Sequence, residues 1–411
     1  MKNFWNEKRL RNYPRIVFIG VWIAMLMNIL FHHGWLGGFG GVIGVDIISN
    51  YASGLQYKYN INDLYSLQSQ DEFQQSIYKQ EDRIGQYSIF ISPPFVALIN
   101  SFVTLLPFGY AFVIWTLLSI TLGLFSIYLI ERFLISENLK YHLTFSQLFF
   151  LVFGFPPLVF GLMFGQNHLL TLLLLTGILI LSIKEHWFLA GIVLGLLMYK
   201  PHLVIGFLII FLVYKRLKTL LGFSLITILW AGIVVIQHGF QPYLSYYEFL
   251  VGELYLIIQT GMLDTTLFAL VASATHGFIQ DFIRSIVPYW IALFSLLLAM
   301  VITTPPVKTS KISVYILAIL FPYIVSPHLL LYELSSLFLV MILWARDNPS
   351  PKMIKLSIFT YISVLIFGVL SKITGISLFG IIPTMLCFLV LREMVLLYKI
   401  NPDRHISYSN S

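Results

Sequence analysis

The feature that most constrains this chain is a series of long apolar runs that recur from residue 16 to residue 397. Short polar turns separate the runs, and several of them approach the roughly 20 residues that a helix needs to cross the hydrocarbon of a bilayer. Only 10% of the residues are charged, whereas a soluble domain averages about 25%. The sequence therefore predicts an all-α polytopic membrane protein.

The apolar runs predict twelve spans with both termini in the cytosol. Most of the 25 lysines and arginines then fall on the cytosolic side, as the positive-inside rule requires. The first run follows several basic residues without a small-residue cleavage site close behind it, so we interpret it as a retained signal-anchor. Two further apolar segments, 92–106 and 262–278, are expected to lie on or dip into the outer face. The expected spans are 16–31, 108–131, 143–163, 167–183, 187–199, 202–214, 219–237, 285–303, 312–325, 329–344, 356–371 and 375–392.

The same pattern predicts a basic cytosolic N-terminus over residues 1–15, a single membrane-embedded domain over 16–397, and a cytosolic tail over 398–411. The first outer loop of the domain, residues 32–107, is expected to carry interfacial helices. The net charge of +7 comes from turns between spans, so it gives no indication of nucleic-acid binding. The single cysteine, Cys387, cannot form an internal disulfide.

Most of the 18 acidic residues are expected on or near the outer face, and Asp46 is the first of them. From Val45 onward the pattern VDIISNYASGLQY predicts a short amphipathic helix at the membrane interface. Two roles fit a carboxylate near the start of such a helix. One is an acidic cap that interacts with the helix dipole, and the other is a general base that takes a proton from a hydroxyl.

Three separate turns bring further polar side chains to the predicted outer face. Each turn alone is more often structural than functional, but ionisable groups are costly at membrane depth and together indicate a site. Lys200, before a proline at the edge of the hydrocarbon, suits the phosphate of a lipid carrier. No P-loop, H-E-x-x-H motif or cysteine pair is present, so the sequence does not support nucleotide hydrolysis or zinc chemistry. The three turns carry Gln166, Asn167 and His168; Lys200 and His202; and His328, Tyr332 and Glu333.

The order of these segments resembles glycosyltransferase family 87, integral membrane enzymes of the GT-C class. The similar segments cover roughly residues 40 to 340. They are VDIISNYASGLQYKYNINDLY, SPPFVALINSFVTLLPFGYAFVIW, FPPLVFGLMFGQNHLL, LAGIVLGLLMYKP and SPHLLLYEL. The resemblance implies a GT-C fold and an inverting transfer of a sugar, usually mannose, from a polyprenyl-phosphate carrier. The acceptor would be a hydroxyl of a glycolipid or glycan on the outer face of the plasma (inner) membrane.

The resemblance also implies roles for individual residues. Asp46 falls on the general base of the family, and Lys200 and His328 fall on positions that we expect beside the donor phosphate. Ser92 and Glu333 depart from the usual aromatic and aspartate residues. No nucleotide is expected, because the donor already carries an activated phosphate, and no essential metal is expected, because no cluster of acids is spaced to hold one. The remaining candidates for substrate binding are Gln166, Asn167, His168, Tyr332 and Glu333.

Two other classes of membrane protein fit twelve spans or an outer-face site. A lipid-linked sugar flippase or transporter should place ionisable residues in the middle of spans and show repeated halves. A polymerase or ligase of lipid-linked saccharides usually centres on a large outer loop between late spans. Here the acids gather at the outer ends of spans and the longest polar stretch, residues 60–88, follows the first span. Both observations favour the glycosyltransferase.

Overall fold

The computed structural model describes residues 7–33, 37, 42–77, 88–136, 143–252, 264–275, 285–304, 311–347 and 351–400. All secondary-structure elements assigned within these ranges are helices, and an isolated β-bridge joins Asp264 to Leu330. The all-α class predicted from the sequence is therefore confirmed. Parts of four predicted segments lie outside the described ranges, namely residues 1–6 of the N-terminus, 78–87 of the polar stretch, 262–263 and 276–278 of the second outer-face segment, and 401–411 of the tail.

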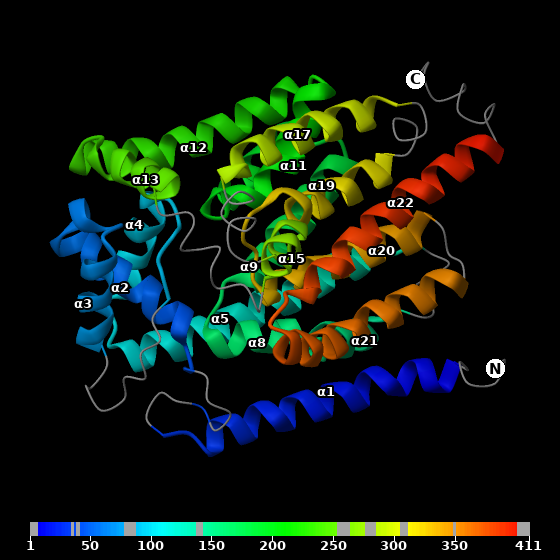
Figure 1. Ribbon diagram of the computed structural model, residues 1–411, viewed down its shortest axis with the longest axis horizontal. Coiled ribbons are helices and arrows are strands. Elements are labelled where there is room, and N and C mark those ends of the chain that lie inside the picture. The colour runs from blue at the N-terminus through cyan, green and yellow to red at the C-terminus, as the bar shows by residue number, and fades with distance from the viewer. Residues whose placement is uncertain are drawn as a thin grey trace. The chain divides into compact units, whose positions relative to one another are not determined.

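The chain forms two compact units, which are drawn in Figure 1. Unit 1 comprises Met1–Glu131, His142–Leu174 and Ser224–Ile257, and unit 2 comprises Arg132–Tyr141, Leu175–Phe223 and Ile258–Ser411. Three helical elements contribute residues to both units, namely η3 (Ile130–Leu134), α9 (His168–Ile183) and α12 (Leu217–His238).

Unit 1 is built around the short helix α2 (Val45–Tyr59), which packs against α3, α4, α5 and α8. The helix is present as predicted, but ten of its residues from Asp46 to Tyr57 are buried, so it does not expose one whole face as an interfacial helix would. The other elements of the unit are α1 (Glu7–Leu30), η1 (Ile61–Asp63), α3 (Leu67–Ile77), α4 (Pro94–Val103), α5 (Phe108–Leu129), α7 (Phe145–Phe153), α8 (Pro156–Phe164) and α13 (Gln241–Gly252).

The contact between α2 and α4 depends on two local features of the sequence. Helix α4 begins at Pro94, as the proline pair predicts, because a proline in the first turn lacks only an N–H that would have no helical partner. Gly54 of α2 faces the backbone of α4, where a β-carbon would lie 2.5 Å from the carbonyl oxygen of Asn100. The two helices therefore approach more closely than side chains at this point would allow.

One predicted span of unit 1 is bent. Residues 143–163 were expected to form one span, and the structure has α7 and α8 there with a bend of 64° between them. Gly154 ends α7, and Pro156 and Pro157 begin α8. A proline removes a backbone donor and its ring clashes with the preceding turn, so the α7 helix cannot continue through this pair.

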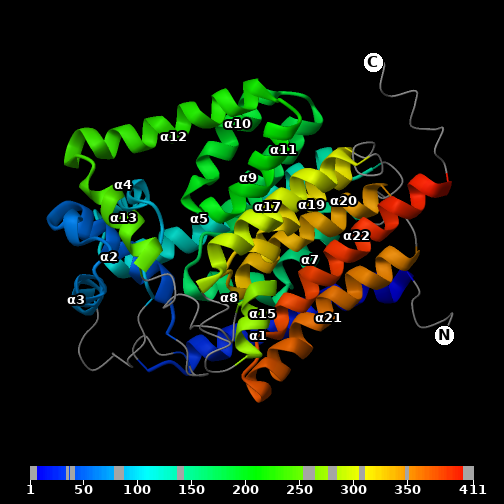
Figure 2. The same ribbon diagram turned by 45° about the horizontal axis from the view of Figure 1, so that its top comes forward.

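Unit 2 is a bundle in which α19 (Lys311–Val325) packs against α11, α17, α20 and α22. Figures 1 and 2 both show α19, α20 and α22 side by side. The remaining elements are η3 (Ile130–Leu134, one residue pair of which belongs to unit 1), α10 (Trp187–Leu196), η4 (Leu197–Tyr199), α11 (Pro201–Val213), α15 (Leu267–Ser273), α17 (Val287–Thr303), η6 (Leu331–Ser336), α20 (Leu337–Asp347), α21 (Pro351–Thr374), η7 (Leu378–Gly380) and α22 (Ile381–Ile400).

The helices of the described ranges support a membrane protein but not the full count of twelve spans. Four are long and apolar enough to cross a bilayer, namely Asn12–Leu30, Phe108–Leu134, Leu217–His238 and Leu378–Leu396. A fifth is added if the bent pair α7–α8 is one span. Most of the other predicted spans correspond to shorter apolar helices of 10–17 residues. The predicted span 329–344 begins in the 3₁₀ turn η6 rather than in an α-helix.

Candidate functional site

Asp46 lies in the first turn of α2, as the sequence predicts. The turn is formed by Gly44, which has a φ of 72° and whose N–H donates to the carbonyl oxygen of Met163 at 2.9 Å. Glycine adopts this left-handed conformation without the steric cost that other residues meet. The carboxylate of Asp46 is therefore held at the N-terminus of a buried helix, and the residue is only 7% exposed.

The carboxylate of Asp46 also accepts a hydrogen bond from a residue outside α2. The hydroxyl of Ser88 donates to Oδ1 of Asp46 at 2.8 Å. The carbonyl oxygen of Ser88 in turn accepts from Nε2 of Gln74, a buried side chain of α3, at 2.8 Å. These two hydrogen bonds connect the polar stretch that follows α2 to the carboxylate of Asp46 at the start of α2. Neither Ser88 nor Gln74 was recognised in the sequence, because their relation to Asp46 arises only from the fold.

The junction between α8 and α9 brings two of its three predicted residues close to α2. Ile47 packs against Gly165, and the indole Nε1 of Trp115 donates to the carbonyl oxygen of Gly165 at 2.9 Å. Asn167 lines the same small pocket as Ile47, and Gln166 is half-buried at the junction.

His168 has a different environment from its two neighbours. It is the first residue of α9 and is fully buried. Its imidazole lies over Gly161 of α8, where a β-carbon would be only 2.4 Å from the ring. The side chain therefore packs into the helix contact, and does not line the pocket that Asn167 faces.

The pocket that Ile47 and Asn167 line is small and has both polar and apolar walls. It has a volume of about 20 Å³, which is room for one water-sized group. The polar side chains in its wall come from α2, α4 and the α8–α9 junction, and its apolar walls come from α2, α4 and α5. The lining residues are Ile47, Asn50, Tyr51, Val96, Asn100, Val103, Trp115 and Asn167.

Unit 2 contains the second group of predicted residues. Lys200 stands between η4 and α11, and its ammonium forms a close ion pair with the carboxylate of Glu333 in η6. Both are buried, with Lys200 8% and Glu333 3% exposed. The ammonium nitrogen also lies 5.5 Å from the ring centroid of Tyr332, within the range of a cation–π contact. Three predicted residues from two distant segments therefore meet in one unit.

Two histidines complete the polar cluster of unit 2. His202, on the first turn of α11, interacts electrostatically with both Lys200 and His328. Nδ1 of His328 lies 2.7 Å from Oδ1 of Asp264, which is fully buried. Asp264 was expected at the outer face but was not recognised as part of a site. We define the polar cluster of unit 2 as Lys200, His202, Asp264, His328, Tyr332 and Glu333.

The sequence was compared with models of known protein families. The family model of glycosyltransferase family 87 matches residues 90–368. The chain belongs to glycosyltransferase family 87. The resemblance predicted from the motifs is thereby confirmed, and the matched residues include the whole polar cluster of unit 2 and the α8–α9 junction. Asp46 precedes the matched range. Neither a curated protein nor a solved structure gives a significant match.

Family 87 membership makes this protein a glycosyltransferase. The candidate residues described in each unit offer acids, histidines and a lysine as chemical groups. In the part of the chain that the structure describes, no three His, Cys, Asp or Glu side chains are grouped so as to hold a metal ion. The groups present can accept a proton, as Asp46 can, or donate hydrogen bonds to an anion, as Lys200 and the histidines can.

Proposed function

We propose that this family 87 glycosyltransferase moves mannose from a polyprenyl-phosphate carrier to a hydroxyl of a glycolipid or glycan acceptor. The reaction would take place on the outer face of the plasma membrane, with both termini in the cytosol. The observation that carries the proposal is the buried ammonium of Lys200 within apolar helices. A cation in such surroundings suits a phosphate that is attached to a lipid.

Asp46 is assigned as the general base. The acceptor hydroxyl loses its proton to the Asp46 carboxylate while its oxygen forms a bond to the anomeric carbon. The bond between that carbon and the phosphate oxygen breaks on the opposite face, and polyprenyl phosphate leaves with the electron pair. A β-linked donor thus gives an α-glycoside. A positioned base contributes about 10²- to 10⁴-fold to such a step.

The polar cluster of unit 2 is assigned to the donor phosphate. The leaving phosphate gains negative charge in the transition state, and hydrogen-bond donors fixed in advance around it stabilise that charge. Lys200 has three N–H donors, so its ammonium can keep its contact with Glu333 and still donate to a phosphate oxygen. His328 offers a further donor. Gln166 and Asn167, at the junction near α2, are assigned to substrate contacts in unit 1.

The test is sugar transfer by purified protein in lipid, with radiolabelled polyprenyl-phosphate mannose as donor and a membrane glycolipid extract as acceptor. Asp46→Asn keeps the shape of the side chain and removes the base. Asp63→Asn, an exposed acid of η1, is the matched control. We expect transfer by wild type and the control, and a loss of at least about 10²-fold in Asp46→Asn, with donor binding retained.

Two results would contradict the proposal at different points. Equal transfer by Asp46→Asn and wild type would remove Asp46 from the reaction and leave the donor assignment intact. Transfer of sugar from nucleotide donors alone, with none from polyprenyl-phosphate mannose, would overturn the assignment of the lipid carrier. Movement of the lipid-linked sugar across the bilayer without transfer would favour a flippase.

A further inference from the structure

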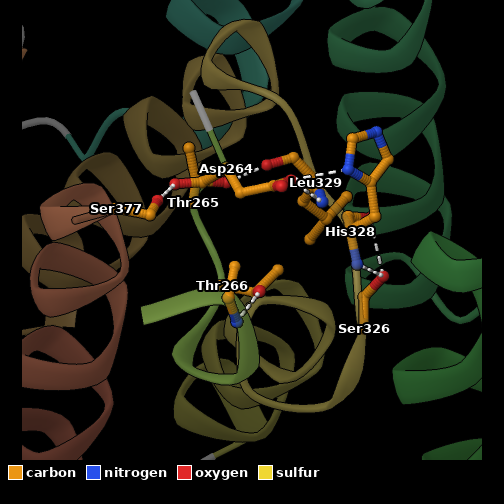
Figure 3. A network of polar contacts seen from close by, with 8 residues as sticks. Asp264, Thr265, Thr266, Ser326, His328, Leu329 and Ser377 are labelled. Atoms are coloured by element: carbon orange, nitrogen blue, oxygen red, sulfur yellow. Dashed lines mark hydrogen bonds and ion pairs between the residues drawn. The ribbon is translucent and has the colours of Figure 1, made fainter. Parts of the chain in front are cut away.

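Asp264 is a buried carboxylate to which the proposed mechanism assigns no individual role. It is fully buried, and Oδ1 accepts a hydrogen bond from the N–H of Leu329 at 3.1 Å. The same oxygen lies 2.7 Å from Nδ1 of His328. Figure 3 shows the carboxylate directed toward the imidazole ring, with the second ring nitrogen on the side away from it.

The backbone around Asp264 is fixed by bonds that do not involve its charge. The N–H and the hydroxyl of Thr265 both donate to the carbonyl oxygen of Leu329, at 2.7 and 2.9 Å. The hydroxyl of Ser377 donates to the carbonyl oxygen of Asp264 itself. These contacts hold residues 264–266 against residues 328–330 (Figure 3). A neutral side chain at position 264 could also accept from the N–H of Leu329.

The negative charge at this position is therefore not explained by the fold. Burying an ionised carboxylate is costly unless a charged or strongly donating partner compensates for it. Oδ2 of Asp264 is buried and has no hydrogen-bond partner among the described residues. His328 is the ionisable group that directly contacts the carboxylate, so the role of the charge is to be sought in what it does to the imidazole.

We infer that Asp264 is a positioning residue that fixes the orientation and the proton of His328 for contact with the donor phosphate. A carboxylate can only accept, so the 2.7 Å ion pair with Asp264 favours a proton on Nδ1 of His328. A phosphate oxygen is also an acceptor, so Nε2 must carry a proton as well when it contacts the phosphate. The adjacent carboxylate stabilises this doubly protonated imidazolium, as in other Asp–His pairs. This inference rests on the proposed function, because it assigns His328 to the donor phosphate.

The other ionisable groups of the cluster do not replace Asp264 in this role. Lys200 is a cation and His202 is an imidazole, so neither supplies a negative charge, and both interact electrostatically within the cluster. A neighbouring cation disfavours the protonated imidazole. Glu333 is already engaged with Lys200. Asp264 is thus the carboxylate that can sustain a proton on both nitrogens of His328.

The test is a double-mutant cycle on donor turnover with Asp264→Asn, His328→Gln and the combined variant. Asn is nearly isosteric with Asp and can still accept from the N–H of Leu329. We expect Asp264→Asn to lower kcat about tenfold or more with a smaller change in KM for the acceptor. In the His328→Gln background the same substitution should cost almost nothing, because Asp264 acts through the missing ring. Thr265→Val is the control, since it removes a hydrogen bond from the same backbone contact and leaves His328 and Asp264 unchanged.

A purely structural role gives a different pattern. If Asp264→Asn costs the same in both backgrounds, or if Thr265→Val lowers kcat as much, the inference is overturned.

A substrate-free measurement separates this inference from the proposed function. Carbethoxylation modifies neutral imidazole, so His328 should react faster at pH 7 in Asp264→Asn than in wild type or Thr265→Val, as followed by mass spectrometry. Equal rates would overturn the pairing. Absence of mannose transfer by wild type would instead overturn the proposed donor.

Discussion

The hydroxyl of Ser88 donates a 2.8 Å hydrogen bond to Oδ1 of Asp46, across 42 positions of sequence. An acceptor alcohol that loses its proton to Asp46 must make the same kind of contact, an O–H directed at a carboxylate oxygen. The Ser88 hydrogen bond limits the rotation of the Asp46 carboxylate, and general base catalysis requires a carboxylate of fixed orientation.

Removal of the Ser88 hydroxyl should slow transfer without abolishing it. In Ser88→Ala the carboxylate of Asp46 loses one hydrogen bond and some of its orientation, so we expect kcat to fall about 2- to 13-fold, which corresponds to about 0.5–1.5 kcal/mol. Ser88→Thr keeps the hydroxyl and should restore most of the rate. Ser76→Ala, at an exposed serine of α3, is the control. An unchanged kcat in Ser88→Ala would show that α2 alone orients the carboxylate.

The ion pair of Lys200 and Glu333 allows the effects of substitutions on stability and on activity to be separated. Lys200→Met leaves the Glu333 carboxylate buried without its cation, and we expect a loss of about 3–5 kcal/mol in stability. The double variant with Glu333→Leu replaces both charges by apolar groups and should recover most of that stability. Transfer should remain lost in both, because the phosphate has no ammonium to contact. Thermal unfolding in detergent and donor turnover measure the two effects.

A double variant that recovers transfer along with stability would contradict the role of Lys200. The same pair of measurements on Lys200→Arg tests geometry. Arginine keeps the charge but has a planar head of different shape, so this variant should keep more stability than Lys200→Met. An activity equal to wild type would show that the charge suffices.

An aromatic cluster in unit 1 predicts a loss of stability at alkaline pH. Tyr65 stacks within 5.1–6.1 Å of Phe90, Tyr246 and Phe249, and burial raises the pKa of its phenol well above the ordinary value. Burial raises the pKa of Tyr243 to about 12. The unfolded chain releases these protons near pH 10 and the folded protein does not. The free energy of unfolding should therefore be unaffected below pH 10 and fall as the pH rises above it.

Tyr65→Phe separates this ionisation from the hydrogen bond that Tyr65 donates to the carbonyl oxygen of Ser92 at 2.7 Å. At pH 8 the variant should be less stable by about 1 kcal/mol. Above pH 10 its melting temperature should decline less steeply than that of wild type. Tyr59→Phe, at an exposed tyrosine, should change neither quantity. Parallel pH profiles for Tyr65→Phe and wild type would contradict the prediction.

Gly54 should be intolerant of even the smallest side chain. A β-carbon there would lie 2.5 Å from the carbonyl oxygen of Asn100, so Gly54→Ala must separate α2 from α4. We expect a loss of about 1–3 kcal/mol in stability and reduced transfer, since Asp46 is on the same helix. Gly109→Ala on α5 has open space around the added carbon and should be neutral or slightly stabilising. A melting temperature of Gly54→Ala equal to wild type would show that the helices adjust without cost.

Local patterns predicted the parts of the fold that local physics determines. The helix from Val45, the start of α4 at Pro94 and the position of Asp46 in a first turn all follow from residues within a few positions of each other. The break between α7 and α8 coincides with a glycine and a proline pair, but the residues on both sides are apolar, so hydrophobicity alone predicts one continuous segment. Hydrophobicity reports burial in lipid or protein and does not report the continuity of a helix.

The parts of the site that the sequence did not predict depend on contacts between distant segments. Asp264 meets His328 across 64 positions, and no periodicity marks such a pairing. Ser88 and Gln74 are ordinary polar residues whose importance comes from the fold. His168 shows the reverse case, because its motif suggested a ligand-binding side chain and the structure packs it against Gly161. Side chains with the same chemistry thus differ in role according to what the helices around them leave accessible.

The pairing of Lys200 with Glu333 has a consequence for which anions can bind. As a unit the pair is neutral and buried, so a free phosphate ion would lose its hydration on entry and meet no uncompensated positive charge there. A phosphate carried on a long hydrocarbon chain differs, because the chain itself partitions into an apolar environment and contributes free energy that the ion lacks. The protein would then discriminate its donor from abundant inorganic phosphate by the tail of the molecule, and use the charged head only to set its position.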